Sequence, residues 1–256
     1  MATYTKKGNK GKSKVEKEQD IAAGSTTAEV FNTLDETASK TEAFVEKNQK
    51  YIFIIIAVVA AVVLGYLGYN EFIAKPKQVT AMNDMSQAQK YFNEAVNGTA
   101  KDSLYTLSLN GGEGKFGMLD IIKEYSGTPS ANLANYYAGT AYLRLKDYKN
   151  AIEHLGNFKS DDEILAPLAK GNIGDAFAQL NQKEDALDYY EQAAEMRNNE
   201  YTAPMYLYKA GVIALDLGKA DKALKYFNKI KDEFPNSSEA ATIEVFIGKA
   251  QVLANK

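Results

Sequence analysis

The pattern of hydrophobic and polar positions divides the chain into three parts. Residues 51 to 70 read YIFIIIAVVAAVVLGYLGYN and contain no charged residue. Before this stretch, apolar residues recur at three- and four-residue steps over residues 28 to 49, which predicts an amphipathic helix. After it, residues 72 to 256 also show helical spacing. The pattern therefore predicts an all-α chain.

The uncharged stretch predicts a transmembrane helix over residues 50 to 71. A helix rises about 1.5 Å per residue, so twenty residues span roughly 30 Å, the thickness of a bilayer's hydrocarbon core. The stretch starts too late and is too long for a signal peptide, and no convincing cleavage site follows it. Tyr51, Tyr66 and Tyr69 would lie near the two membrane interfaces. The alternatives are a cleaved signal and a buried helix of a soluble domain.

The residues before the span differ from the rest in composition. Residues 1 to 27 are rich in Lys, Gly, Ser and Thr and poor in large apolar side chains, so we expect a disordered, Lys-rich cytoplasmic tail. Such a tail could solubilise the chain and fix its topology, or contact anionic lipid or ribosomal RNA. Its lysines favour a cytoplasmic N-terminus and a large domain on the outer side. The apolar face of the helix over residues 28 to 49 comprises Val30, Phe31, Leu34, Ala38, Thr41, Phe44 and Val45.

Charge and cysteine content exclude several classes of function. The net charge is −3, so no surplus of Lys and Arg is present to bind nucleic acid. The chain has no Cys, which excludes disulfides, thiolate catalysis and Cys-based zinc sites. We therefore expect no nucleic-acid partner.

The sequence offers no arrangement typical of catalysis. His154 is the only histidine, and no Cys or Ser pattern gives it a partner, so we expect a surface or packing role. The acidic run at Asp161, Asp162 and Glu163 is typical of a solvated loop. GGEGK at residues 111 to 115 suggests a phosphate loop, but Phe116 stands where Ser or Thr would bind magnesium. The sequence predicts no enzyme, no cofactor and no metal site.

Three segments in the C-terminal part share one spacing of residue types. In each, an Ala follows a Gly by twelve residues, and a large apolar residue follows that Ala by four. Two antiparallel helices approach closely only where small residues lie at their crossing, so each segment predicts a helix, a turn and a second helix. The three sets are Gly139, Ala151 and Leu155; Gly174, Ala186 and Tyr190; and Gly211, Ala223 and Phe227.

This spacing resembles that of tetratricopeptide repeats, whose period is about 34 residues. Some positions depart from the pattern, because Ala214 replaces an aromatic residue and the repeat-ending proline is present only as Pro235. We expect an α-solenoid over residues 129 to 256, closed by a capping helix that contains Gly248. Residues 72 to 128 would form membrane-proximal helices or an atypical repeat.

The resemblance implies a concave groove that is lined by the first helices and binds an extended segment or a partner helix. Some of these side chains could instead pack against the capping helix, and the convex face is an alternative binding surface. The Lys and Asn that clamp C-terminal carboxylates in some repeats of this kind are absent. The expected groove residues are Leu133, Tyr136, Thr140 and Arg144 from the first repeat; Leu168, Gly171, Asp175 and Gln179 from the second; and Met205, Tyr208, Val212 and Asp216 from the third.

The order of features over residues 33 to 256 resembles the YfgM-like proteins of the bacterial inner membrane. The resemblance rests on LDETASKTEAFVEKNQK before the span, the span itself, NEF after it and the helical repeats. Those proteins are ancillary subunits of the Sec translocon. The resemblance implies a single-pass protein with a periplasmic repeat domain. Its partners would be translocon subunits, a periplasmic chaperone and newly exported unfolded chains, with membrane lipid around the span. The Lys-rich tail departs from the family.

Two other functions are compatible with the same features. An anchored receptor for precursor proteins would turn its repeats toward the cytosol, as on the mitochondrial outer membrane. A scaffold for cell-envelope or division machinery would bind no client chain at all. Repeat folds serve many functions, so the sequence alone does not choose between these partners.

Overall fold

The computed structural model describes residues 26–98 and 101–255 of the chain. These residues form helices and contain no β-strand, apart from one isolated bridge between Gly112 and Lys115. The predicted all-α fold is confirmed. The chain divides into two compact units, Met1–Tyr69 and Asn70–Lys256. The predicted tail over residues 1 to 27 lies almost wholly outside the described residues.

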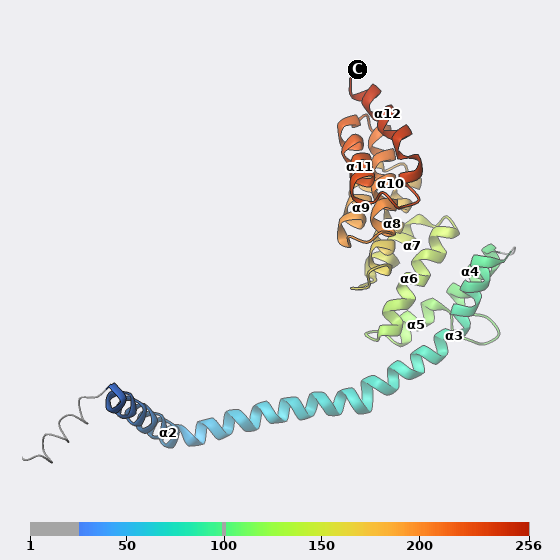
Figure 1. Ribbon diagram of the computed structural model, residues 1–256. Helices are drawn as coiled ribbons and strands as arrows, with labels where there is room; N and C mark the ends of the chain where they lie inside the picture. Colours follow the sequence, from blue (N-terminus) through green and yellow to red (C-terminus); the bar gives the residue numbers. More distant parts are fainter. Residues whose placement is uncertain (1–25, 99–100, 256) are drawn as a thin grey trace, which may run out of the picture. The chain divides into compact units, whose positions relative to one another are not determined.

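The first unit contains one long helix, α2 (Thr26–Tyr69) (Figure 1). The helix joins the amphipathic stretch and the uncharged stretch without a break. Its apolar side chains are exposed, including Phe53 and Leu64, and the most hydrophobic window in this part of the chain is 0% buried. By length and composition this helix is able to cross a membrane.

The second unit begins with the π-helix η1 (Asn70–Ala74) and α3 (Lys75–Asn97), followed by α4 (Lys101–Asn110) and α5 (Met118–Glu124). A core that includes Met85, Phe92 and Met118 joins these helices to α6 (Pro129–Arg144). The ring of Tyr137 on α6 lies 4.9 Å from that of Phe92. The helices α3, α4 and α5 therefore pack against α6, the first helix of the first repeat.

The remaining helices form three pairs and a final single helix. The pairs are α6 with α7 (Tyr148–Asn157), α8 (Leu165–Gln179) with α9 (Lys183–Met196), and α10 (Thr202–Asp216) with α11 (Ala220–Glu233). A 3-10 helix, η2 (Ala240–Thr242), leads into α12 (Ile243–Ala254). Figure 1 shows these helices stacked in chain order toward the C-terminus.

The small residue of each first helix faces the bulky residue of its second helix, as the spacing predicts. A Cβ atom built on Gly139 would lie 2.6 Å from Leu155 Cγ, and one on Gly211 would lie 2.3 Å from a Phe227 ring carbon. A Cβ atom built on Gly174 would lie 2.7 Å from a ring carbon of Tyr190. A Cβ atom at these positions would force the facing residue to shift, so the glycines allow the helices of a pair to approach closely.

The turns inside the three repeats share one backbone conformation. Lys146, Asn181 and Gly218 stand at equivalent positions and have φ values of 64°, 60° and 72°. The backbone amide of the next residue donates a hydrogen bond back into the first helix in each repeat, as in Asp147 N to Tyr142 O at 2.9 Å. This left-handed ending is typical of helix C-termini and favours glycine, which only the third repeat has.

The final helix α12 covers the third repeat. Ile243, Ile247 and Ala250 are buried in the same core as Phe227. Phe246 lies 4.9 Å from Tyr208 and 5.6 Å from Phe227, measured between ring centroids. The predicted capping helix is therefore confirmed.

Replacing Gly211 by Ala should destabilise the repeat domain, because the new methyl group would collide with a ring that is 0% exposed. We expect the free energy of unfolding to fall by about 1 to 2 kcal/mol, after the helix-propensity gain of Ala is subtracted. Gly248→Ala is the matched control, since no heavy atom lies within 4 Å of its added Cβ. It should raise stability by about 0.5 to 1 kcal/mol. Urea unfolding of the full chain in a non-ionic detergent measures both, and equal effects would refute the close-approach role of Gly211.

Candidate protein-binding groove

The first helices of the three repeats are neighbours in the stack. α8 contacts both α6 and α10. On each helix the expected groove residues follow one another at three- or four-residue steps, so they share a helix face. The expected set therefore occupies corresponding faces of three adjacent helices, although its members differ in how open they are.

The exposed members of this set lie at the C-terminal ends of the first helices. Arg144, Gln179 and Asp216 are exposed and stand in the last turn of α6, α8 and α10. Thr140 and Gly171 are buried. The half-buried members are Leu133, Tyr136, Leu168, Asp175, Met205, Tyr208 and Val212. The most accessible part of the face is thus polar and lies near the turns inside the repeats.

A cavity of ≈ 550 Å³ and another of ≈ 470 Å³ border the repeats, and the smaller one belongs to this face. It brings together Arg144, Asp175 and Gln179 from the expected set. Its other lining residues are Leu143, Lys146, Tyr148, Asn172, Ala178 and Tyr190. Sequence reasoning missed Lys146 and Tyr148 because they follow the first helix. Their position directly beside a predicted turn is the only signal that could have found them.

Asp175 forms hydrogen bonds with two residues, Tyr190 and Lys209. Tyr190 Oη donates a hydrogen bond of 2.7 Å to Asp175 Oδ1, and Lys209 Nζ donates to both carboxylate oxygens at 2.7 and 2.9 Å. Burial, aided by the Asp175 charge, raises the pKa of Tyr190 and of Tyr206 well above the usual value. These phenols therefore stay neutral at physiological pH. Asp175 ties the second repeat to the third through Lys209.

The aromatic members of the set take part in packing. The Tyr136 ring lies 5.3 Å from that of Phe158, and burial raises the pKa of its hydroxyl. Tyr208 packs against Phe246 of the capping helix. Leu168 and Met205 pack on the core shared by the second and third repeats. These side chains support the stack whether or not they also touch a ligand.

The exposed members make weaker contacts. Gln179 accepts a hydrogen bond from Tyr148 Oη at 3.4 Å, and Asp216 lies 3.3 Å from Lys183 Nζ. Arg144 forms no ion pair within the part of the chain that the structure describes. Surface pairs of this kind contribute little to stability. Arg144 and Gln179 are therefore open to a partner at small cost to the fold.

His154 takes a packing position on α7. Its Nδ1 atom lies 3.0 Å from Asn135 Oδ1, and its ring stacks on Tyr142 at 5.4 Å. Burial lowers its pKa, so the ring is held neutral between the two helices of the first repeat. The residues that the structure describes contain no group of three or more His, Asp or Glu side chains that could hold a metal ion.

Asp175→Ala should lower the free energy of unfolding by about 1 to 3 kcal/mol, because the Tyr190 hydroxyl and Lys209 would lose their shared acceptor. Asp216→Ala is the control on the neighbouring first helix. Its exposed pair with Lys183 should be worth less than about 1 kcal/mol. Urea unfolding of both variants compares them directly. Equal losses would mean that Asp175 does not join the second and third repeats.

Two tetratricopeptide repeat family models match the chain, one over residues 133–162 and one over residues 172–238. The first range covers most of α6 and α7, and the second runs from α8 to the residues after α11. A search of curated proteins found no significant match. The matched ranges agree with the three helix pairs. The part of the second unit from α6 to α12 is therefore a tetratricopeptide-repeat solenoid with a capping helix, an architecture that serves protein binding.

Proposed function

We propose that this chain is a single-pass membrane protein whose repeat domain binds segments of other proteins at the outer face of a bacterial inner membrane. There it would act as an ancillary subunit of the Sec translocon and assist a periplasmic chaperone with newly exported chains. The observation that carries the proposal is the presence, in one chain, of a fully exposed apolar helix and tetratricopeptide repeats.

The anchor is supported by the surface of α2. No charged residue lies between Lys50 and Glu71, and side chains such as Ile55 and Val62 are 62% and 67% exposed. Water disfavours so large an apolar surface, whereas lipid tails accommodate it. The helical backbone also satisfies its own hydrogen bonds, as a membrane segment requires.

The binding role is supported by the open part of the groove face. The exposed Arg144 and Gln179 border a cavity of ≈ 470 Å³, which is within the usual range for ligand sites. Half-buried apolar side chains such as Val212 lie on the same helix faces. A mixed surface of this kind suits an extended segment of varied sequence better than one rigid ligand.

The translocon assignment rests on the order of features along the chain, from FVEKNQK through the span and NEF to the repeats. One observation favours a scaffold instead. Tyr136, Asp175 and Tyr208 already have partners within the stack, which leaves less of the groove for a client chain. The identity of the proteins that accompany the chain separates the two functions.

Purification of the C-terminally tagged chain from gently solubilised membranes, followed by mass spectrometry, tests the proposal. We expect Sec channel subunits and a periplasmic chaperone to accompany the protein. The double variant Arg144→Glu, Gln179→Ala should reduce recovery of client chains about fivefold or more, because both side chains border the open cavity. Both residues are exposed, so the fold should survive.

Lys225→Glu with Gln251→Ala is the matched control, since both side chains are exposed on α11 and α12 away from this cavity. It should leave recovery unchanged. Division or envelope proteins in place of the Sec subunits would contradict the translocon role and indicate a scaffold. Equal client recovery with both double variants would exclude the groove as the binding surface.

A further inference from the structure

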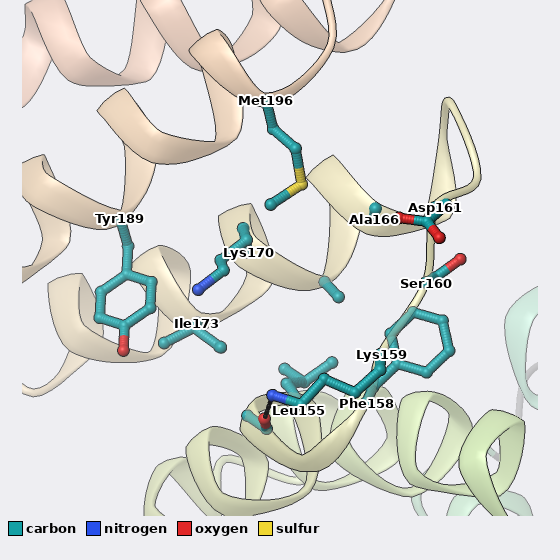
Figure 2. Close-up of a pocket in the computed structure, with 12 residues that line it drawn as sticks. Leu155, Phe158, Lys159, Ser160, Asp161, Ala166, Lys170, Ile173, Tyr189 and Met196 are labelled. Carbon is teal, nitrogen blue, oxygen red and sulfur yellow. Dashed lines mark hydrogen bonds between the residues drawn. The ribbon is translucent and has the colours of Figure 1, made fainter. Parts of the chain in front are cut away.

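The larger cavity, of ≈ 550 Å³, lies at the junction between the first and second repeats (Figure 2). Its lining comes from α7, the loop after it, α8 and α9. None of the expected groove residues lines it. Leu155, Phe158, Ala169 and Ile173 are buried and give it an apolar floor. Lys159 and Lys170 are the two basic residues in its lining.

Equivalent residues differ between this junction and the next one along the stack. Position for position, Ala169 corresponds to Tyr206, whose ring is 1% exposed and lies against Gly171. A Cβ atom on Gly171 would fall 1.9 Å from that ring. At the second junction the tyrosine thus comes from α10 and the glycine from α8, whereas at the first junction the tyrosine is Tyr136 on α6 and the small residue is Ala169 on α8.

The two lysines also depart from the pattern of the next junction. Lys159 and Lys170 stand where the second junction has Ala194 and Leu207, which are 5% and 4% exposed. The first junction thus replaces two buried apolar residues by two cations beside an apolar floor. Lys159 is exposed and Lys170 is half-buried, so both remain within reach of solvent and of a partner.

The lysines of the cavity have only neutral partners. Lys159 Nζ donates to the Gly156 carbonyl at 3.2 Å, and Lys170 Nζ donates to Gln192 Oε1 at 3.4 Å. Neither forms an ion pair among the residues described by the structure. The lysines at the next junction differ, since Lys183, Lys209, Lys219 and Lys222 pair with Asp216, Asp175, Glu184 and Glu191, respectively.

The one acidic residue of the lining does not compensate these charges. Asp161 lies 3.7 Å from the guanidinium of Arg197, and the Arg197 side chain also donates to the Asp161 carbonyl at 3.1 Å. Tyr189 and Met196 complete the lining. Figure 2 shows the two lysine side chains on opposite sides of the space, one from α8 and one from the segment after α7. Within the lining itself, Lys159 and Lys170 are therefore the two cations without an acidic partner, and the acidic run Asp161, Asp162 and Glu163 borders the cavity from the same loop.

We propose that this cavity binds an acidic segment of a partner protein, with one apolar side chain on the floor and neighbouring carboxylates on Lys159 and Lys170. This inference rests on the proposed protein-binding function and adds a second surface, outside the groove, with a defined partner chemistry. The volume of ≈ 550 Å³ is ordinary for a ligand site. Charge-assisted hydrogen bonds to the two ammonium groups would supply the selectivity for acidic partners.

The test uses the full chain in a non-ionic detergent and two fluorescein-labelled dodecapeptides. One peptide has a phenylalanine between two glutamates in a Gly and Ser background, and the other has lysines in place of the glutamates. We expect the glutamate peptide to bind about tenfold more tightly, as measured by fluorescence anisotropy. Its affinity should fall as salt rises, because the contacts are ionic and partly exposed.

The variant Lys159→Ala, Lys170→Leu copies the second junction at the two lysine positions, so it should fold while it removes both cations from the lining. Its affinity for the glutamate peptide should fall about tenfold. The control variant Lys149→Ala, Lys225→Leu removes two exposed lysines outside the cavity lining and should bind this peptide as the wild type does. Equal affinity for the two peptides, or unchanged binding by the variant without the two lysines, would overturn the inference. If the chain binds dodecanoate but does not bind the glutamate peptide, the inference is also wrong, and the ligand of the cavity is a small amphiphile instead.

Failure of this inference differs from failure of the proposed function. If the recovery of client chains depends on Arg144 and Gln179 but the glutamate peptide does not bind, only the assignment of the cavity is wrong. If the glutamate peptide binds through Lys159 and Lys170 but no translocon component accompanies the tagged chain, the translocon role fails and the cavity assignment stands.

Discussion

The contact between a small residue on the first helix of each repeat and a bulky residue on the second determines how closely the two helices pack. Gly139 against Leu155 and Gly211 against Phe227 show the contact at two places in the stack. Because no Cβ atom separates the helices, apolar side chains close the core around them. The close pairing repeats along the chain, so the first helices come side by side and present corresponding faces. The groove, the cavities and the capping contact all depend on that regular spacing.

Departures from the repeat pattern carry most of the functional information. The second junction is closed by Tyr206 and crossed by the Lys209 pair with Asp175, which makes it a structural joint. The first junction has Ala169 and two lysines without acidic partners at the corresponding places. These two lysines are the basis of the binding role that we propose for the cavity at the first junction.

The features that were predictable from the sequence are those set by short-range spacing. The offset from Gly211 to Phe227 identified the crossing of the helix pair within one repeat, and the distance of one repeat period from Gly211 to Gly248 identified the capping helix. Contacts between repeats were not predictable in the same way. The pairing of Asp175 with Lys209 and the place of Tyr208 against Phe246 depend on how neighbouring repeats stack. The cavity is lined by residues from two neighbouring repeats, so it too depends on how the repeats stack.

We propose that the uncharged stretch anchors the repeat domain across a membrane from the Lys-rich tail. The side of the membrane on which the domain stands decides which partners it meets. The absence of Cys allows single cysteines to be introduced without background. Ser13→Cys marks the tail, and Ser238→Cys marks an exposed position in the repeat domain. A membrane-impermeant maleimide applied to cells with a permeabilised outer membrane should label Ser238→Cys at once and Ser13→Cys only after lysis. Labelling of Ser13→Cys alone would place the repeats in the cytoplasm and contradict the account.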